Sequence, residues 1–174
     1  QAVLGASDNR DVDAVYCGSD LVGYGPQPNE VCAVIRDRAI PTIHGNYDYA
    51  IGRDLEDCGC AYVDPHDREI GQLSVDWTLA HTSRASKDFM RGLPFDLRFE
   101  LAGKRVRLVH GSPRKVNEYL FEDKPARTLE RIAANADCDV LVSGHTHKPW
   151  IREYGGVLFS QCGSDGETVG EGHP

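Results

Sequence analysis

Short apolar runs alternate along this chain with longer segments whose apolar residues recur at helical spacing. Residues 13–17, 40–43 and 139–142 form such runs, and each is bounded by glycine, proline or polar residues. Short bounded runs are typical of strands buried in a parallel sheet, and the segments between them are typical of helices that cover the sheet. The pattern predicts an α/β fold in a single domain over residues 1–174, with a mostly parallel sheet between helices.

Four helices and two hairpins are predicted around these runs. We expect each helix to turn its apolar stripe toward the core. Ser83 is expected as the N-cap of the third helix, and turns at Gly103 and Gly155 predict the hairpins. The helical stripes are Val31, Val34 and Ile35; Ile70, Leu73, Trp77 and Ala80; Phe89, Met90 and Leu93; and Leu129, Ile132, Ala133 and Ala136.

The charge balance limits the partners of the protein. Nineteen Lys and Arg against 27 Asp and Glu give a net charge of -8, which repels bulk nucleic acid and anionic membrane surfaces. No apolar stretch approaches the ~18 residues of a membrane helix, and no secretory signal is visible. We therefore expect a cytoplasmic protein with a small-molecule partner, and we leave open whether it is a monomer or a homodimer.

The six cysteines form no recognisable framework. A chain of 174 residues can build its own core without disulfides, so we expect mostly free thiols. Cys58-Gly59-Cys60 is the one suggestive pair, but its spacing is neither the redox Cys-x-x-Cys pattern nor half of a zinc site. We expect a loop or core role for it.

Polar side chains that can bind a metal follow four of the predicted strands. Ligands in open α/β sheets bind beyond the carboxyl ends of the strands, so we expect these side chains to meet in space. Each one alone has an ordinary explanation as a cap, a turn former or a satisfied histidine, and it is their coincidence that favours a metal site. They are Asp20, Asn46, His110, His145 and His147.

Neighbouring residues and donor types narrow the predicted site. Gly45, Gly111 and Gly144 each lie beside a candidate ligand, where glycine allows a sharp turn and a close backbone approach. His145 and His147 are two residues apart and face the same side of an extended backbone. Mixed oxygen and nitrogen donors favour Mn, Fe, Zn or Ni over Mg or Ca.

These residues carry a resemblance to a known family. Ser19-Asp20, Gly45-Asn46 with Asp48, His110, and Gly144-His145-Thr146-His147 resemble the ordered motif set of the calcineurin-like metallophosphoesterases. The chain from residue 1 to about 166, including LVGYGPQPNE, HGSPRKVNEYLFED and GHTHKPW, is similar to the compact bacterial and archaeal phosphodiesterase branch of that family.

The resemblance implies a four-layer α/β/β/α sandwich of mixed sheets and a pair of divalent metal ions. It implies that Asp20 bridges both ions, that Asn46, His110 and His145 complete one of them, and that His147 binds the other. A hydroxide bridging the two ions would then attack a phosphodiester or a nucleotide-like phosphate ester. Asp20, Asn46, His110 and His145 are the catalytic residues on this hypothesis.

The sequence departs from the family pattern at three places. The family opens with a strand ending in Asp-x-His, and no such motif precedes Asp20. We therefore expect the given chain to be truncated at its N-terminus, without its first strand, and the end at Pro174 hints at a missing last strand. Ser19 stands where the family has glycine. Tyr47 stands where many members have the histidine credited with protonating the leaving group, so Asp48 is expected only to cap the next helix.

Charged and aromatic residues near the ligands are candidates for substrate binding. Arg114 and Lys115 follow His110 and are placed to hold phosphate, and Tyr24 and Tyr47 are candidates for shaping a pocket. Loop residues on the same sheet edge that could join them are Asn29, Asn117 and Tyr119.

Three hypotheses remain open. The leading one is a dinuclear metal-dependent phosphohydrolase acting on phosphodiester or nucleotide-like substrates. The second is a catalytically impaired member of the same fold that binds metal and a nucleotide. The third is a structural or redox protein whose cysteines and histidines hold zinc, and it is disfavoured because the cysteines do not fall at strand ends. Signature motifs of P-loop enzymes, serine hydrolases and zinc proteases are absent.

Overall fold

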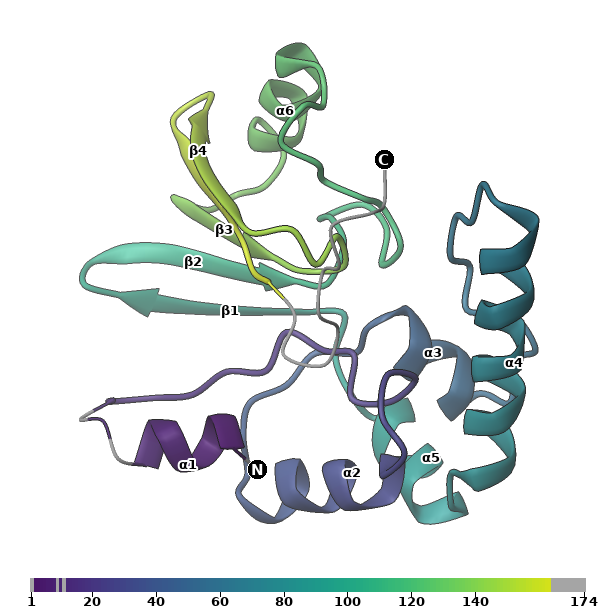
Figure 1. Cartoon of the computed structure of the whole chain (residues 1–174). Helices are drawn as coiled ribbons and strands as arrows, with labels where there is room; N and C mark the ends of the chain where they lie inside the picture. The colour runs from purple at the N-terminus through teal and green to yellow at the C-terminus, as the bar shows by residue number, and fades with distance from the viewer. Residues whose placement is uncertain (1, 9, 11, 164–174) are drawn as a thin grey trace.

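The computed structural model describes residues 2–8, 10 and 12–163, so the expectations about the two chain ends lie outside the described residues. Figure 1 shows the helices α2–α5 grouped at one end of the molecule and the sheet with α6 at the other. The elements in chain order are α1 (Ala2–Asp8), α2 (Pro28–Asp37), α3 (Asn46–Gly52), α4 (Pro65–His81), α5 (Arg84–Arg91), β1 (Asp96–Leu101), β2 (Lys104–Val109), α6 (Ala126–Ala133), β3 (Val140–Ser143), β4 (Trp150–Tyr154) and β5 (Val157–Gln161).

A five-stranded mixed sheet carries the second half of the chain. Its strand order is β1-β2-β3-β5-β4. The central strands β2, β3 and β5 run parallel, and β1 and β4 pair antiparallel at the two edges. Both edge pairs are the hairpins predicted from the glycine turns, since Leu101 pairs with Lys104 and Tyr154 with Val157. The predicted α/β class with a mixed sheet is confirmed.

Two separate hydrophobic cores hold the fold together. The first lies between α6 and the sheet and includes Leu129, Leu141 and Phe159, all nearly inaccessible to solvent. The second lies among α2–α5 and includes Ile51 and Met90. The predicted cap of α5 is confirmed, because the Ser83 hydroxyl accepts a hydrogen bond from the Ser86 N–H at 3.2 Å. No helix among the described residues is both long and apolar enough to cross a membrane.

The two N-terminal apolar runs are less regular than predicted. Residues 13–17 and 40–43 meet only in a single parallel bridge, between Cys17 and Thr42. Pro41 has no N–H to donate, which limits the ladder that this segment can form. The prediction of full buried strands at these two runs was therefore wrong. The bridge is nevertheless parallel, so both segments end on the same side.

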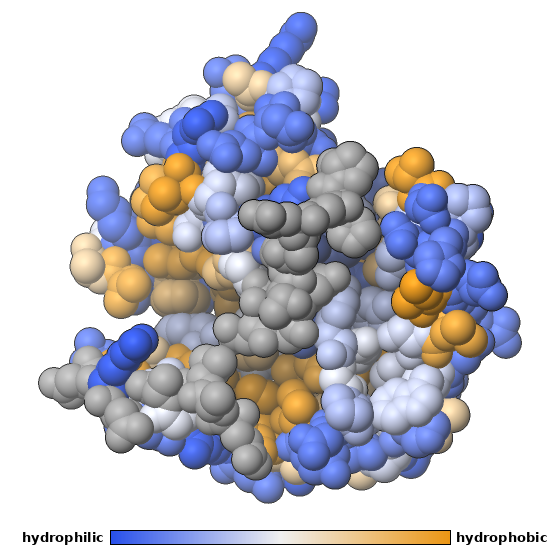
Figure 2. Space-filling model, viewed as in Figure 1, coloured by the Kyte–Doolittle hydropathy of each residue, from blue (hydrophilic) through white to orange (hydrophobic). Residues whose placement is uncertain are grey.

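The large apolar residues of α4 face the solvent, although they were predicted to face the core. Ile70, Leu73 and Trp77 are 52%, 62% and 40% exposed, and hydrophobic patches lie at the edge of the molecule formed by α4 (Figure 2). The helix instead buries a face of smaller side chains, which lets it approach its neighbours closely. That buried face consists of Gly71, Val75 and Thr78.

Candidate functional site

The parallel pair β2 and β3 brings two predicted ligands together. His110 directly follows β2, and His145 comes two residues after β3. The N–H of Gly144 donates to the carbonyl of His110 at 2.8 Å, which extends the contact between the two strand ends. Because parallel strands end at the same edge of a sheet, the two imidazoles become neighbours, with ring centroids 5.0 Å apart.

The Cys17–Thr42 bridge does the same for the other two ligands. Asp20 lies three residues beyond one side of the bridge, and Asn46 lies four residues beyond the other, at the first position of α3. The N–H of Tyr47 donates to Asp20 Oδ1 at 3.1 Å. A Cβ atom at Gly45 would lie 1.8 Å from the same oxygen, so only glycine leaves room for the carboxylate.

These four side chains converge on one atom, the Nε2 of His110. It lies 3.1 Å from Asn46 Oδ1, 3.2 Å from His145 Nδ1 and 3.6 Å from Asp20 Oδ2. The side chains of His110 and Asp20 are 1% and 0% exposed. The cluster is therefore closed to bulk water.

Hydrogen bonds outside the cluster fix which atoms point into it. His110 Nδ1 lies 3.0 Å from the carbonyl of Gly18, which can only accept, so Nδ1 carries the proton and Nε2 presents a lone pair. Asn46 Nδ2 donates to the carbonyl of Cys58 at 3.0 Å, which turns Oδ1 inward. With Asp20 ionised, acceptor atoms of His110, Asn46 and Asp20 thus face one another.

Burial makes this arrangement unfavourable unless a cation joins it. Within the described residues, Asp20 Oδ2 and His145 Nε2 are buried and lack a hydrogen-bond partner. Burial, reinforced by the charge of Asp48, raises the pKa of Asp20 well above its usual range. Burial lowers the pKa of His110 to about 4 and that of His145 to about 3, which keeps both imidazoles neutral, as metal binding requires.

The spacing of the donor atoms fits a single coordination shell. Ligand atoms at ~2.0–2.2 Å from an ion lie about 3 Å from one another, close to the distances measured around His110 Nε2. Counting only His, Cys, Asp and Glu, no group of three or more in the described part of the chain could hold a metal ion. Asp20, His110 and His145 are thus not gathered closely enough to count as such a group, and the match to a coordination shell rests on the distances around His110 Nε2, including the one to the amide oxygen of Asn46.

His147, the fifth predicted ligand, lies beside this cluster. Its ring packs edge-on against Tyr24, with centroids 5.0 Å apart. It is close enough for its charge to contribute to the lowered pKa values of His110 and His145. The structure thus brings four predicted ligands into contact and sets the fifth against an aromatic ring.

Asp48 ties together the two loops that carry Asp20 and Asn46. Its carboxylate accepts hydrogen bonds from the N–H of Gly45 at 3.0 Å and from the N–H of Leu21 at 2.9 Å, and it contacts the Ser19 hydroxyl. Burial raises the pKa of Asp48. The expected cap of the following helix is confirmed, and the contacts with Ser19 and Leu21 extend its role to the neighbouring loop.

Sequence reasoning missed two neighbours of the ligands. Asn46 Nδ2 lies 3.2 Å from Cys60 Sγ, so the Cys-Gly-Cys segment lines the back of the candidate site. Tyr119 stacks on the imidazole of His145, with centroids 4.0 Å apart. Its place in a strand-end loop marked Tyr119 only as a pocket candidate, and nothing in the sequence pointed to the cysteine contact.

The predicted substrate-binding residues have different surroundings. Arg114 forms an ion pair with Glu118 four residues later, and Lys115 is exposed in the same loop. Tyr24 is 40% exposed. Tyr47 is 1% exposed and belongs to the core among α2–α5, so its placement offers no surface to a substrate.

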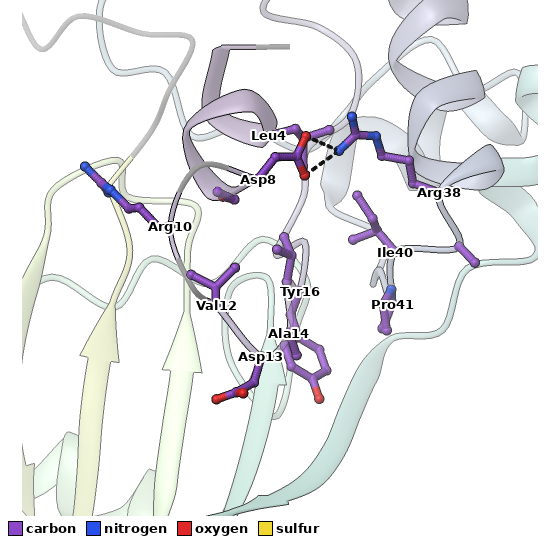
Figure 3. A pocket seen from close by; sticks show the side chains of 13 residues that line it. Leu4, Asp8, Arg10, Val12, Asp13, Ala14, Tyr16, Arg38, Ile40 and Pro41 are labelled. Carbon is purple, nitrogen blue, oxygen red and sulfur yellow. Dashed lines mark hydrogen bonds and ion pairs between the residues drawn. The ribbon is translucent and has the colours of Figure 1, made fainter.

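A hollow of about 580 Å³ lies elsewhere, between α1 and the bridge segments. Figure 3 shows Arg38 and Asp8 paired at its rim, above Tyr16 and Ile40. None of the clustered donor residues lines it. The candidate site is therefore a buried cluster at strand ends and not this open hollow.

Comparison with known proteins identifies the family. The family model described as the calcineurin-like phosphoesterase superfamily domain matches residues 1–173. An uncharacterized protein of Methanocaldococcus jannaschii is 29% identical over 161 residues, which are 91% of this chain and 60% of that protein. A UDP-2,3-diacylglucosamine hydrolase of Hamiltonella defensa is 29% identical over 140 residues, which are 68% of this chain and 54% of that protein.

The chain thus spans between half and two thirds of the length of these two curated relatives. The crystal structure of a metallophosphoesterase from Sphaerobacter thermophilus superposes with a TM-score of 0.66 at 24% identity, over 91% of this chain and 69% of that one. This likeness shows the shared fold. Since the family model covers nearly the whole sequence, the chain belongs to the calcineurin-like phosphoesterase superfamily.

Proposed function

We propose that the protein hydrolyses phosphate esters with divalent metal held by Asp20, Asn46, His110 and His145. The observation that carries this proposal is the convergence of Asn46 Oδ1, His145 Nδ1 and Asp20 Oδ2 on His110 Nε2, with Asp20 Oδ2 buried and without a hydrogen-bond partner among the described residues. Such a cluster is costly to bury unless a cation compensates it. Membership of a phosphoesterase superfamily supports the same reading.

Each residue has a distinct task in this proposal. Asp20 supplies the negative charge, and its Oδ1 is held by the N–H of Tyr47 so that Oδ2 stays directed at the cluster. The carbonyl of Gly18 orients the ring of His110. A bound divalent ion supplies Lewis acidity, which polarises a phosphoryl oxygen and lowers the pKa of water. We propose that His147 and Asp20 would help to hold a second ion, with Mn, Fe, Zn or Ni as the metal.

The proposed substrate class is a phosphodiester or a nucleotide-like phosphate ester. Support comes from the relative named a UDP-2,3-diacylglucosamine hydrolase, whose name contains a nucleotide-linked sugar. Lys115 and Tyr24 are exposed near the ligand-bearing loops and are the proposed contacts for such a substrate. Tyr47 is not proposed as the acid for the leaving group, because burial raises the pKa of its phenol.

The test is hydrolysis of bis-p-nitrophenyl phosphate by the full-length protein with Mn²⁺, together with Mn²⁺ binding measured by calorimetry. We expect His145→Ala to lose both binding and turnover. His66→Ala is the matched control. It also replaces a histidine with alanine, but His66 is exposed on α4, away from the site. Full metal binding and turnover by His145→Ala would refute the proposal.

A second candidate function is binding without efficient turnover. One observation favours it: Tyr47 stands at the position of the expected histidine acid and is buried in the core. One Mn²⁺ bound per chain with nucleotide binding, and no hydrolysis of any activated diester by the full-length protein, would select this alternative.

A further inference from the structure

Two thiols face each other directly behind the candidate site. The Sγ atoms of Cys58 and Cys60 lie 3.0 Å apart, about one ångström beyond the length of a disulfide bond. Gly59 between them has a φ of +71°, a left-handed conformation that bends the backbone and brings the two side chains to the same side. A small movement of the two sulfur atoms toward each other would be enough to form a disulfide bond.

The same pair holds one of the proposed ligands in place. Asn46 Nδ2 donates to the carbonyl of Cys58 at 3.0 Å and to Cys60 Sγ at 3.2 Å. These two contacts use both hydrogens of the amide and leave only Oδ1 to face His110. The position of the Asn46 oxygen therefore depends on the state of the Cys60 sulfur.

The segment is also accessible from outside. Gly59 is exposed and Cys60 is half-buried, whereas Cys58 is 8% exposed behind them. Asn117 Nδ2 donates to the carbonyl of Gly59 at 2.9 Å and is the contact that steadies the loop from the opposite side. A small oxidant can therefore reach the pair through this segment.

We propose that Cys58 and Cys60 are a redox pair whose oxidation to a disulfide by a hydroperoxide loosens Asn46 and weakens metal binding at the candidate site. The metal part of this inference rests on the proposed function. It assigns a modification site to a segment that lies outside the ligand set.

The reaction balances with hydrogen peroxide as the oxidant. The Cys58 sulfur, to which the Cys60 thiol is hydrogen-bonded, attacks the O–O bond, which breaks to give a sulfenic acid on Cys58 and one water. The Cys60 sulfur then attacks the sulfenic sulfur, the S–S bond forms, and the hydroxyl leaves as a second water. Two thiols are oxidised and one peroxide is reduced to two waters. The disulfide sulfur is a poorer acceptor for the Asn46 amide than the thiol.

The disulfide is tested by peptide mapping of the full-length protein after treatment with hydrogen peroxide or with dithiothreitol. We expect the peptide that contains Cys58 and Cys60 to lose two hydrogen atoms on oxidation and to regain them on reduction. Cys162→Ser, which changes an exposed thiol away from the pair, is the matched control and behaves like wild type. Both thiols remaining free, or Cys162 pairing instead, overturns the inference.

The coupling is tested by calorimetric titration of Mn²⁺ into the reduced and oxidised proteins. We expect about tenfold weaker binding after oxidation, the effect typical of losing a residue that orients a ligand. Cys58→Ser keeps the Cys60 thiol and is expected to bind Mn²⁺ equally with and without peroxide. Equal affinity of reduced and oxidised wild type overturns the coupling. Reduced protein that binds no Mn²⁺ overturns the proposed function instead, while the peptide map still reports on the disulfide.

Discussion

The Asp48 side chain joins the two loops that carry Asp20 and Asn46. Its carboxylate accepts from the N–H groups of Gly45 and Leu21 and contacts the Ser19 hydroxyl, all from inside the protein. An Asn side chain at this position has nearly the same shape as Asp, but it replaces one carboxylate oxygen with an NH₂ group. One of the two buried backbone N–H groups would then face a second donor and lose its hydrogen bond. We expect Asp48→Asn to lower the free energy of unfolding by about 2 kcal/mol, measured by urea denaturation.

Asp76→Asn is the matched control for this change. Asp76 is exposed on α4 and accepts from Gln72 Nε2 at 2.9 Å. We expect its effect on the free energy of unfolding to stay within about 0.5 kcal/mol. If Asp48→Asn is as stable as this control, the carboxylate does not hold the two loops together.

Tyr47 has a structural role where the family places an acid. Its phenol contacts Tyr62 and Cys58, and burial raises its pKa, so the proton stays on the oxygen. We expect Tyr47→Phe to change kcat for bis-p-nitrophenyl phosphate by less than about threefold, whereas loss of a general acid costs about a thousandfold. Steady-state kinetics with Mn²⁺ distinguishes the two. A thousandfold loss would identify the phenol as a proton donor.

The remaining cysteines differ in reactivity because of burial. Burial raises the pKa of Cys17 to about 11 and that of Cys32 to about 12, so both are thiols near neutral pH. Since the thiolate is the nucleophile, we expect iodoacetamide at about pH 8 to label the exposed Cys162 and to leave Cys17 and Cys32 unmodified. The thiolate fraction of Cys17 grows only as the pH approaches its raised pKa. Labelling of Cys32 as fast as Cys162, seen by mass spectrometry, would contradict this.

At the scale of elements, α4 carries apolar side chains on both an exposed face and a buried face. Leu73 is 62% exposed, whereas Val75 two residues later is 2% exposed in the core among α2–α5. We expect Leu73→Ser to change the free energy of unfolding by no more than about 0.5 kcal/mol. Val75→Ala on the same helix is expected to cost about 2 kcal/mol. Chemical denaturation of the pair checks both, and an equal loss in the two variants would show that Leu73 is covered in solution.

The hairpins and the start of α5 could be predicted from local patterns, whereas the N-terminal runs at 13–17 and 40–43 and the contacts between elements could not. The hairpins follow from the glycines at 103 and 155, and the start of α5 from Ser83, because these signals act through neighbours in the chain. The buried face of α4 depends on which surface meets Tyr62, whose ring lies where a Cβ at Gly71 would be. The helical stripe was assigned from the large apolar residues, but the small residue Gly71 is what allows Tyr62 to pack closely against α4.

The same distinction applies to the site. Strand ends in a parallel arrangement predicted where Asp20, Asn46, His110 and His145 would be, and the structure brings these four into contact. The contact between Cys60 and Asn46 was not predictable, because it requires the loop after α3 to fold back across the helix start. The distance between two residues along the sequence does not show whether a loop folds back in this way.

At the scale of the whole molecule, we expect metal binding to increase the free energy of unfolding. A ligand that binds only the folded state at a hundredfold excess over its Kd adds about 2.7 kcal/mol. For a chain of this size that amounts to a rise of about 5–10 °C in Tm. We expect Mn²⁺ to raise the Tm of wild type by this amount over an EDTA-treated sample, measured by scanning calorimetry.

Asp20→Ala and His66→Ala provide the comparison. The first removes the charged donor, so we expect no shift with Mn²⁺, and the second changes an exposed residue of α4, so we expect the wild-type shift. A shift retained in Asp20→Ala would place the ion elsewhere.

The cluster lies at the junction of the two cores. Asp20 and Asn46 are anchored to the helical half, through the bridge segments and α3, whereas His110 and His145 are anchored to the sheet half. An ion held by all four would join the halves across this seam. Sliding of one half against the other would separate these four side chains while each hydrophobic core stayed intact. If the proposed metal site exists, metal binding would then be lost on heating before the protein unfolds.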